Sequence, residues 1–173
     1  MRNKKKRKKY KNPFSMERIN LKYPSIFAAV YLIFVGVLMI YSGTIYTYYW
    51  ILLPRGALSL WSFVLLFIVF FVALGILTAW AITGRSICCR VSKRIIILSL
   101  SATSILTVLW YDCIFSAHAF FPGFIISLIM LLCMVLGLLI SINKYKLMSF
   151  GFGVMLMWYI YLFWFSFCIM LIN

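Results

Sequence analysis

Five long runs of apolar residues constrain the fold of this chain more than any other feature. They cover approximately residues 25–47, 60–83, 95–117, 120–142 and 148–172, and each exceeds the roughly 18 residues that mark a bilayer-spanning helix. A barrel strand would instead alternate polar and apolar residues over about ten positions. Because backbone groups in lipid must be hydrogen-bonded within the protein, helices are the remaining architecture. The sequence therefore predicts an all-α, five-transmembrane-helix bundle.

Composition and domain organisation agree with this prediction. Hydrophobic residues make up 66% of the sequence and charged residues only 11%, whereas soluble domains are about 45–50% apolar and about 25% charged. The chain divides into a basic tail, residues 1–23, and a single membrane domain, residues 24–173, in which residues 48–59 form the first loop. We therefore expect an integral multi-pass membrane protein.

Basic residues predict the orientation of the bundle. The tail to Lys22 holds ten Lys or Arg residues, the second connector holds four and the fourth holds two, whereas Arg55 is alone on the opposite face. The positive-inside rule then places the N-terminus in the cytoplasm and the C-terminus outside. A bacterial plasma membrane is the expected location, or the mitochondrial outer membrane if the source is eukaryotic. We expect the tail to bind anionic lipid headgroups and not nucleic acid.

Few side chains are suited to catalysis or to metal binding. The acids are Glu17 and Asp112, and the single histidine is His118. One histidine and one acid do not form a ligand cluster, so neither a metal site nor a catalytic site is predicted. Asp112, near the outer end of the third span, has two interpretations: a ligand or proton site, or a carboxylate that reaches external water. His118 is interpreted as a residue of a solvated turn.

Aromatic residues follow a fixed spacing from the first loop into the second span. One ungapped register contains, in chain order, Pro54, Trp61, Phe63, Phe67, Phe71 and Gly75. The last three recur every four residues, so they share one face of a helix. This register resembles that of the TspO/MBR family, which comprises tryptophan-rich sensory proteins and mitochondrial translocator proteins.

The resemblance extends beyond this register. Tyr48, Trp110 and Trp158 stand where the family has a Tyr and two Trp residues, and Ile114-Phe115 occupies the place of its F-F pair. Several motif positions depart from the family pattern, with a Pro pair, a Trp, an Asn and a Pro-Tyr pair replaced respectively by Leu58-Ser59, Phe67, Thr107 and Val154-Met155. These departures bear on ligand affinity and on any porphyrin photochemistry.

Family members are five-helix bundles whose first loop covers a cavity for porphyrins and other tetrapyrroles, and in animals for sterols and drug-like aromatics. The resemblance implies a membrane receptor or binding protein for tetrapyrroles or other apolar aromatic ligands, acting in sensing, sequestration or transport. It requires no cofactor, and a bound porphyrin or haem would be the ligand. The implied ligand-binding residues, with Trp61 as the gate of the pocket, are Tyr48, Pro54, Trp61, Phe67, Phe71, Trp110, Phe115, Trp158 and Leu162.

Other interpretations stay open at this point. The rings can form an ordinary helix seam, or the chain can be a small transporter or channel that is unrelated to the family and uses Asp112. A light-dependent porphyrin-degrading enzyme is a further alternative, which the replacement of a family Trp by Phe67 disfavours. A homodimer is also open, because Gly36 and Gly43 lie in the first span, although their spacing differs from G-x-x-x-G.

Overall fold

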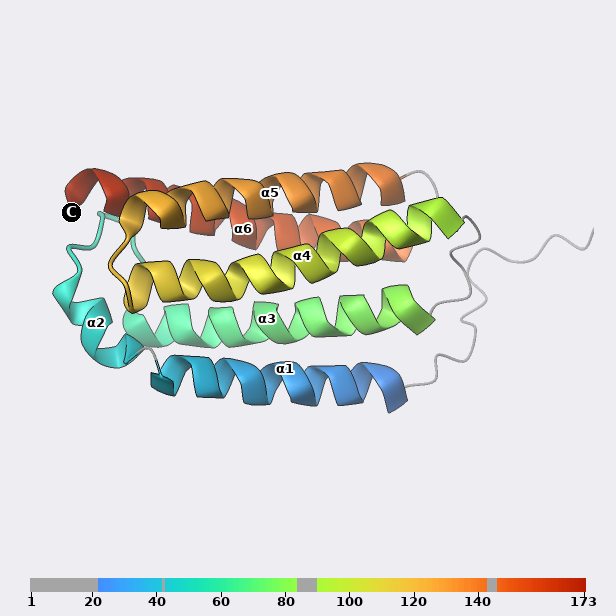
Figure 1. The fold of residues 1–173 in the computed structure, drawn as a ribbon, viewed down its shortest axis with the longest axis horizontal. Helices are drawn as coiled ribbons and strands as arrows, with labels where there is room; N and C mark the ends of the chain where they lie inside the picture. Colours follow the sequence, from blue (N-terminus) through green and yellow to red (C-terminus); the bar gives the residue numbers. More distant parts are fainter. Residues whose placement is uncertain (1–21, 42, 84–89, 143–145) are drawn as a thin grey trace, which may run out of the picture.

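The computed structural model describes residues 22–41, 43–83, 90–142 and 146–173, and this part of the chain forms six helices and no strand. The helices are α1 (Lys22–Tyr41), α2 (Thr44–Trp50), α3 (Leu60–Thr83), α4 (Arg90–Phe115), α5 (Phe120–Ser141) and α6 (Lys146–Ile172). All except α2 are long and apolar enough to cross a membrane, so the predicted all-α, five-helix bundle is confirmed (Figure 1). The basic tail lies almost wholly outside the described residues.

The first predicted span, residues 25–47, is divided in the structure between α1 and α2. Gly43 has a φ of 59°, a left-handed conformation that glycine adopts without steric cost and that interrupts a right-handed helix. Beyond Gly43 the chain turns into α2, which lies at one end of the bundle (Figure 1). Tyr48 and Trp50 are therefore helical residues of α2, and the irregular connection is shorter than the predicted loop.

Four helices form the closed part of the bundle, and α1 is peripheral to it. Helix α4 packs on α5, α5 packs on α6, and α3 contacts both α4 and α6, while α1 packs along α3. Only 6% of the residues in the apolar stretch of α1 are buried, against 44% of those in α4. The start of α1 and the end of α6 lie at opposite ends of the bundle (Figure 1), as an odd number of spans requires.

Glycines allow close approach at several helix contacts, including those of Gly137 and Gly75. A Cβ added at Gly137 of α5 would overlap with the Phe152 ring of α6. One added at Gly75 of α3 would lie 2.8 Å from the Tyr31 ring of α1. Small residues at such positions let membrane helices pack through van der Waals contact. The Gly75 contact fixes how closely α1 lies against α3.

The buried polar groups of the bundle are mainly hydroxyls bonded to helix carbonyls. Thr103 Oγ1 donates to the Ser99 carbonyl at 2.8 Å, and Thr107 Oγ1 donates to the Thr103 carbonyl at 2.7 Å. Every buried side-chain nitrogen or oxygen of the described residues has a hydrogen-bond partner. This is what a bilayer core without water demands.

Candidate aromatic ligand site

A cluster of buried aromatic rings occupies the part of the bundle next to α2. Neighbouring ring centroids lie between 4.7 Å apart, for Tyr111 and Phe115, and 6.5 Å apart, for Trp110 and Phe165. The cluster, called the ring cluster below, consists of Tyr48 of α2, Phe63, Phe67 and Phe71 of α3, Trp110, Tyr111 and Phe115 of α4, and Trp158 and Phe165 of α6. Four elements therefore contribute rings to one continuous apolar core.

Helix α3 supplies the central row of rings. Phe63, Phe67 and Phe71 follow at four-residue steps, and their adjacent centroids are 6.0 Å apart in both pairs. The planes of Phe67 and Phe71 differ by only 8°, an offset-stacked arrangement that aromatic pairs favour. The expectation that Phe67 and Phe71 share one helix face is confirmed.

Trp110 joins α4 to α6 through its indole N–H. Its Nε1 donates to Ser166 Oγ at 2.7 Å, and Ser166 in turn donates to the Leu162 carbonyl at 2.7 Å. Both side chains are fully buried, so this chain of bonds satisfies an indole that would otherwise be costly in an apolar core. Leu162, a sequence candidate, is fully buried and contributes its carbonyl to this chain of bonds.

Trp158 lies at the contact between α3 and α6. Its ring stacks on Phe70 with a centroid distance of 5.0 Å and an interplanar angle of 1°, and it lies 6.1 Å from Phe63. On α6 itself, Tyr161 stacks on the same indole at 5.4 Å. Trp158 therefore links the ring cluster to the aromatic residues that hold the loop above it.

The irregular segment 51–59, called the lid below, is fastened over this end of the bundle by side chains from two helices. Tyr48 Oη donates to the Leu58 carbonyl at 2.5 Å, and the Leu58 amide donates to Tyr161 Oη at 3.3 Å. Asn173 exchanges two hydrogen bonds with the Leu52 backbone, each 3.1 Å long. Pro54 is buried within the lid.

Tyr48 is the titratable group of the lid contact. Burial, reinforced by the nearby Tyr161 hydroxyl, raises the pKa of Tyr48 to about 12. The side chain is therefore a neutral hydrogen-bond donor at physiological pH, as the bond to the Leu58 carbonyl requires.

The structure brings together most of the predicted ligand-binding residues and separates one from them. The residues in the ring cluster or packed directly on it are Tyr48, Phe67, Phe71, Trp110, Phe115, Trp158 and Leu162. Trp61 does not join them, because 71% of its surface is exposed. It precedes Phe63 by two residues, which is roughly 200° around a helix, so it faces away from the row of phenylalanines.

Other members of the cluster were missed among the sequence candidates. Phe63 precedes Phe67 by four residues and Phe165 follows Trp158 by seven, so helical spacing alone could have identified both. Tyr111 is different, since no spacing distinguishes it from its neighbour Trp110. Its burial comes from a tertiary contact, in which its hydroxyl is bonded to Thr44 Oγ1 of α2.

Rings fill the space that the family resemblance assigns to a cavity. Phe63, Phe67 and Trp110 are fully buried and in contact with other rings. Open space lies beside the cluster instead. A pocket of about 250 Å³ at the end of the bundle is bounded by Trp50, Ile51, His118, Phe120 and Asn173.

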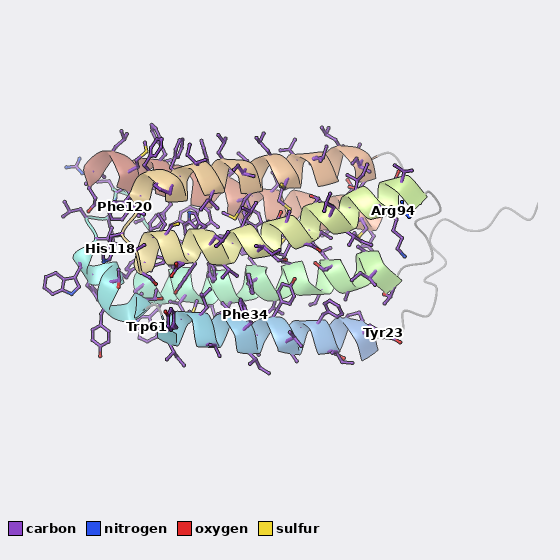
Figure 2. All side chains as sticks on the ribbon, in the orientation of Figure 1. Tyr23, Phe34, Trp61, Arg94, His118 and Phe120 are labelled. Atoms are coloured by element: carbon purple, nitrogen blue, oxygen red, sulfur yellow. The ribbon has the colours of Figure 1, made fainter. Side chains whose placement is uncertain are left out.

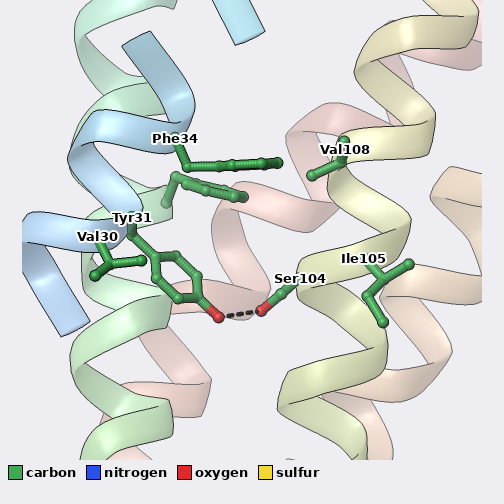
Figure 3. Close-up of a pocket in the computed structure, with 7 residues that line it drawn as sticks. Val30, Tyr31, Phe34, Ser104, Ile105 and Val108 are labelled. Carbon is green, nitrogen blue, oxygen red and sulfur yellow. Dashed lines mark hydrogen bonds between the residues drawn. The ribbon is translucent and has the colours of Figure 1, made fainter. Parts of the chain in front are cut away.

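A second pocket, called the lateral groove below, has a volume of about 220 Å³ and opens on the side of the bundle (Figure 3). It is lined by Val30, Tyr31 and Phe34 of α1, Phe71 of α3, and Ser104, Ile105 and Val108 of α4. The Phe71 ring belongs both to this wall and to the ring cluster. It lies 5.0 Å from the Tyr31 ring and 6.3 Å from the Phe34 ring.

The ionisable candidates lie at the surface. The Asp112 and His118 side chains are exposed, and among the described residues no group of three metal-binding side chains comes together. No carboxylate is among the buried side chains of the described residues. The exposure of Asp112 fits the interpretation of a carboxylate that reaches external water.

Comparison of the chain with protein-family models, with curated proteins and with solved structures finds no match. Function is therefore inferred from the residues and the geometry of this chain.

Proposed function

We propose that this chain is an integral membrane binding protein for apolar aromatic ligands of the tetrapyrrole type, porphyrin or haem-like, and that it acts in sensing, sequestration or transport. The observation that carries the proposal is the ring cluster beneath the lid. Rings at stacking distance provide the flat apolar surfaces on which a macrocycle is held. Membership of the TspO/MBR family is part of this proposal, and the register from Pro54 to Gly75 supports it.

Binding at the cluster requires the lid to move, because the lid covers this end of the bundle and the rings are buried against one another. The lid is held by a few hydrogen bonds, each contributing about 0.5–1.5 kcal/mol net, and by the burial of Ile51 and Pro54. An open state is therefore within reach of a ligand that binds it more tightly than the closed state. Tyr48 and Tyr161 take part both in fastening the lid and in ring contacts, which couples lid opening to exposure of the rings.

The charges of the described residues support the proposed sidedness, with the N-terminus in the cytoplasm. Tyr23 and Arg94 lie at one end of the bundle and Trp61 and His118 at the other (Figure 2). Exposed rings gather at the second end, where Tyr46, Trp50 and Trp61 are 77%, 84% and 71% exposed. This is the behaviour of an interfacial aromatic belt, and we assign Trp61 to it. Anionic headgroups are the proposed partner of the basic end.

Tryptophan fluorescence tests the proposed ligand. Protoporphyrin IX added to the protein in lipid nanodiscs should quench emission saturably, and Trp158→Phe should remove a large part of the quenched signal. Trp61→Phe is the matched control, since that ring is outside the cluster, and it should leave the affinity unchanged. Equal effects of both substitutions, or quenching that never saturates, would contradict the proposal. Illumination followed by product analysis separates a binding protein from an enzyme that degrades porphyrin.

A further inference from the structure

We propose that the lateral groove is a second ligand site, specific for a phenol dissolved in the membrane, which donates its hydroxyl to Tyr31. This proposal is independent of the ring cluster and of any tetrapyrrole. It is argued from the depth, the hydrogen bonding and the volume of the groove.

The groove lies at the middle of the bilayer core. Tyr31, Phe71 and Ser104 are each close to the midpoint of their helices, α1, α3 and α4. The rim is open, since Val30, Phe34 and Ile105 are 57%, 46% and 63% exposed. An occupant at this depth must come from the lipid phase, so it is largely apolar and carries few polar groups.

One hydrogen-bonded pair is the polar feature of the groove. Tyr31 Oη and Ser104 Oγ lie 2.8 Å apart and connect α1 to α4 (Figure 3). Ser104 Oγ also donates to the Leu100 carbonyl at 2.9 Å, and a serine hydroxyl has a single hydrogen. Tyr31 must therefore be the donor of the shared bond.

This assignment leaves Tyr31 as an acceptor. Its hydrogen is used by Ser104, while its oxygen keeps lone pairs toward which no other described residue directs a donor. In the bilayer core a ligand hydroxyl gains from such an acceptor, because neither group can bond to water there. A ligand that only accepts hydrogen bonds gains nothing.

Volume and shape select a single aromatic ring. A dry cavity of about 150 Å³ lined by apolar side chains is enough to hold benzene, and the groove measures about 220 Å³. The space is too small for a macrocycle, since sites for drug-sized ligands begin at about 300 Å³. The rings of Phe34 and Phe71 stack on each other with an interplanar angle of 18° and add aromatic surface to the groove, and an alkyl substituent leaves through the open rim into lipid.

Competitive photolabelling in phosphatidylcholine nanodiscs tests the proposal. The label is an alkylphenol with a diazirine on its alkyl chain, and the competitors are 4-propylphenol, its methyl ether and propylbenzene. Labelled peptides should map to α1 near Val30 and α4 near Ile105. Val108→Trp, which fills the groove, should abolish this labelling, whereas Phe165→Leu, in the ring cluster and without a ring contact to the groove wall, should leave it in place.

Two hydroxyl variants test the role of Tyr31. The double variant Tyr31→Phe/Ser104→Ala keeps the walls but has no acceptor, so the phenol should lose about three- to tenfold in competition while propylbenzene is unchanged. Comparing each competitor with itself across variants cancels its partitioning into lipid. Ser104→Ala alone frees the Tyr31 hydrogen, and the methyl ether should then compete better than it does with the wild type.

The outcomes decide the proposal in either direction. The phenol loss in the double variant together with the gain of the ether in Ser104→Ala supports it. If all three competitors respond alike in every variant, the groove holds only apolar chains such as lipid tails, and the proposal is overturned. Labels that map away from α1 and α4 overturn it as well. Tyr41→Phe, an exposed tyrosine of α1, is the control for removal of a hydroxyl.

Discussion

The ring cluster and the lateral groove share the Phe71 ring but differ in how they meet a ligand. The cluster is filled by its own side chains, and the Trp110 indole and the Tyr48 and Tyr111 hydroxyls are bonded within the protein. The groove keeps open space and an unused acceptor lone pair. A ligand entering the cluster displaces protein groups, whereas one entering the groove displaces lipid. We therefore expect slow, lid-limited binding at the first and fast exchange at the second.

Removal of a ring gives the largest expected difference between the two regions. Phe67 is fully buried and Phe34 is 46% exposed. Phe67→Ala should reduce the free energy of unfolding by about 3–5 kcal/mol, the usual cost of deleting a core phenylalanine. Phe34→Ala should cost about 1 kcal/mol. Unfolding by a denaturing detergent in mixed micelles measures both, and similar losses would contradict the distinction between a packed core and an open rim.

A glycine pair tests the packing of α1, which forms one wall of the groove. Gly75→Ala places a Cβ 2.8 Å from the Tyr31 ring, so α1 must shift, and we expect a loss of about 1–3 kcal/mol. Gly36→Ala is the matched control, because no atom lies within 4 Å of the added Cβ. Its stability should stay within about 0.5 kcal/mol of the wild type. If both variants behave alike, α1 is not held at this contact.

Much of the fold was predictable because each membrane span corresponds to a long run of apolar residues. All five spans were found, and the error fell at Gly43, where one residue with a left-handed φ divides a continuous apolar run. The change from the mainly aliphatic α1 to the Tyr- and Thr-rich α2 marks this break only indirectly, since Tyr is also typical of the interfacial end of a single span. Helix α4 runs from Arg90 to Phe115, whereas the predicted span covered residues 95–117.

The aromatic residues of the candidate site could be predicted from the sequence, but the presence or absence of a cavity among them could not. Four-residue spacing predicts that Phe67 and Phe71 share a face, and it would have added Phe63. The same spacing argues against Trp61, which the family resemblance had favoured. Sequence gives no access to whether rings enclose a cavity or fill it, because this depends on side-chain packing between helices. The lateral groove depends on Tyr31 and Ser104, which belong to no motif and meet only through tertiary packing.

The indole bond of the cluster gives a smaller effect. Trp110→Phe and Ser166→Ala each remove one partner of the 2.7 Å bond, and each should lower the free energy of unfolding by about 1–3 kcal/mol, because the remaining polar group is buried. The double variant should lose less than the sum of the two, by about 0.5–1.5 kcal/mol. Strict additivity in this mutant cycle would show that the bond does not contribute to the packed region.

Titration of Tyr48 gives the smallest effect and is confined to the lid. The pKa of Tyr48 is raised from 10.0 to about 12, mainly by burial. Below pH 10 the hydroxyl is protonated in both the folded and the unfolded chain, so its stabilising effect is fully present. Between about pH 10 and 12 the unfolded chain releases its proton first, and the folded state loses stability as the pH rises.

The difference in tyrosinate absorbance between the wild type and Tyr48→Phe reports this titration directly. Its midpoint should lie near pH 12, and porphyrin association in the wild type should accelerate as the pH approaches that value, because the ionised oxygen no longer donates to the Leu58 carbonyl. Tyr48→Phe should associate rapidly at every pH. Tyr46→Phe, which removes an exposed tyrosine of the same helix, should bind like the wild type. A midpoint near pH 10 would show that Tyr48 is not buried, and the ring cluster would then be as open to its surroundings as the groove.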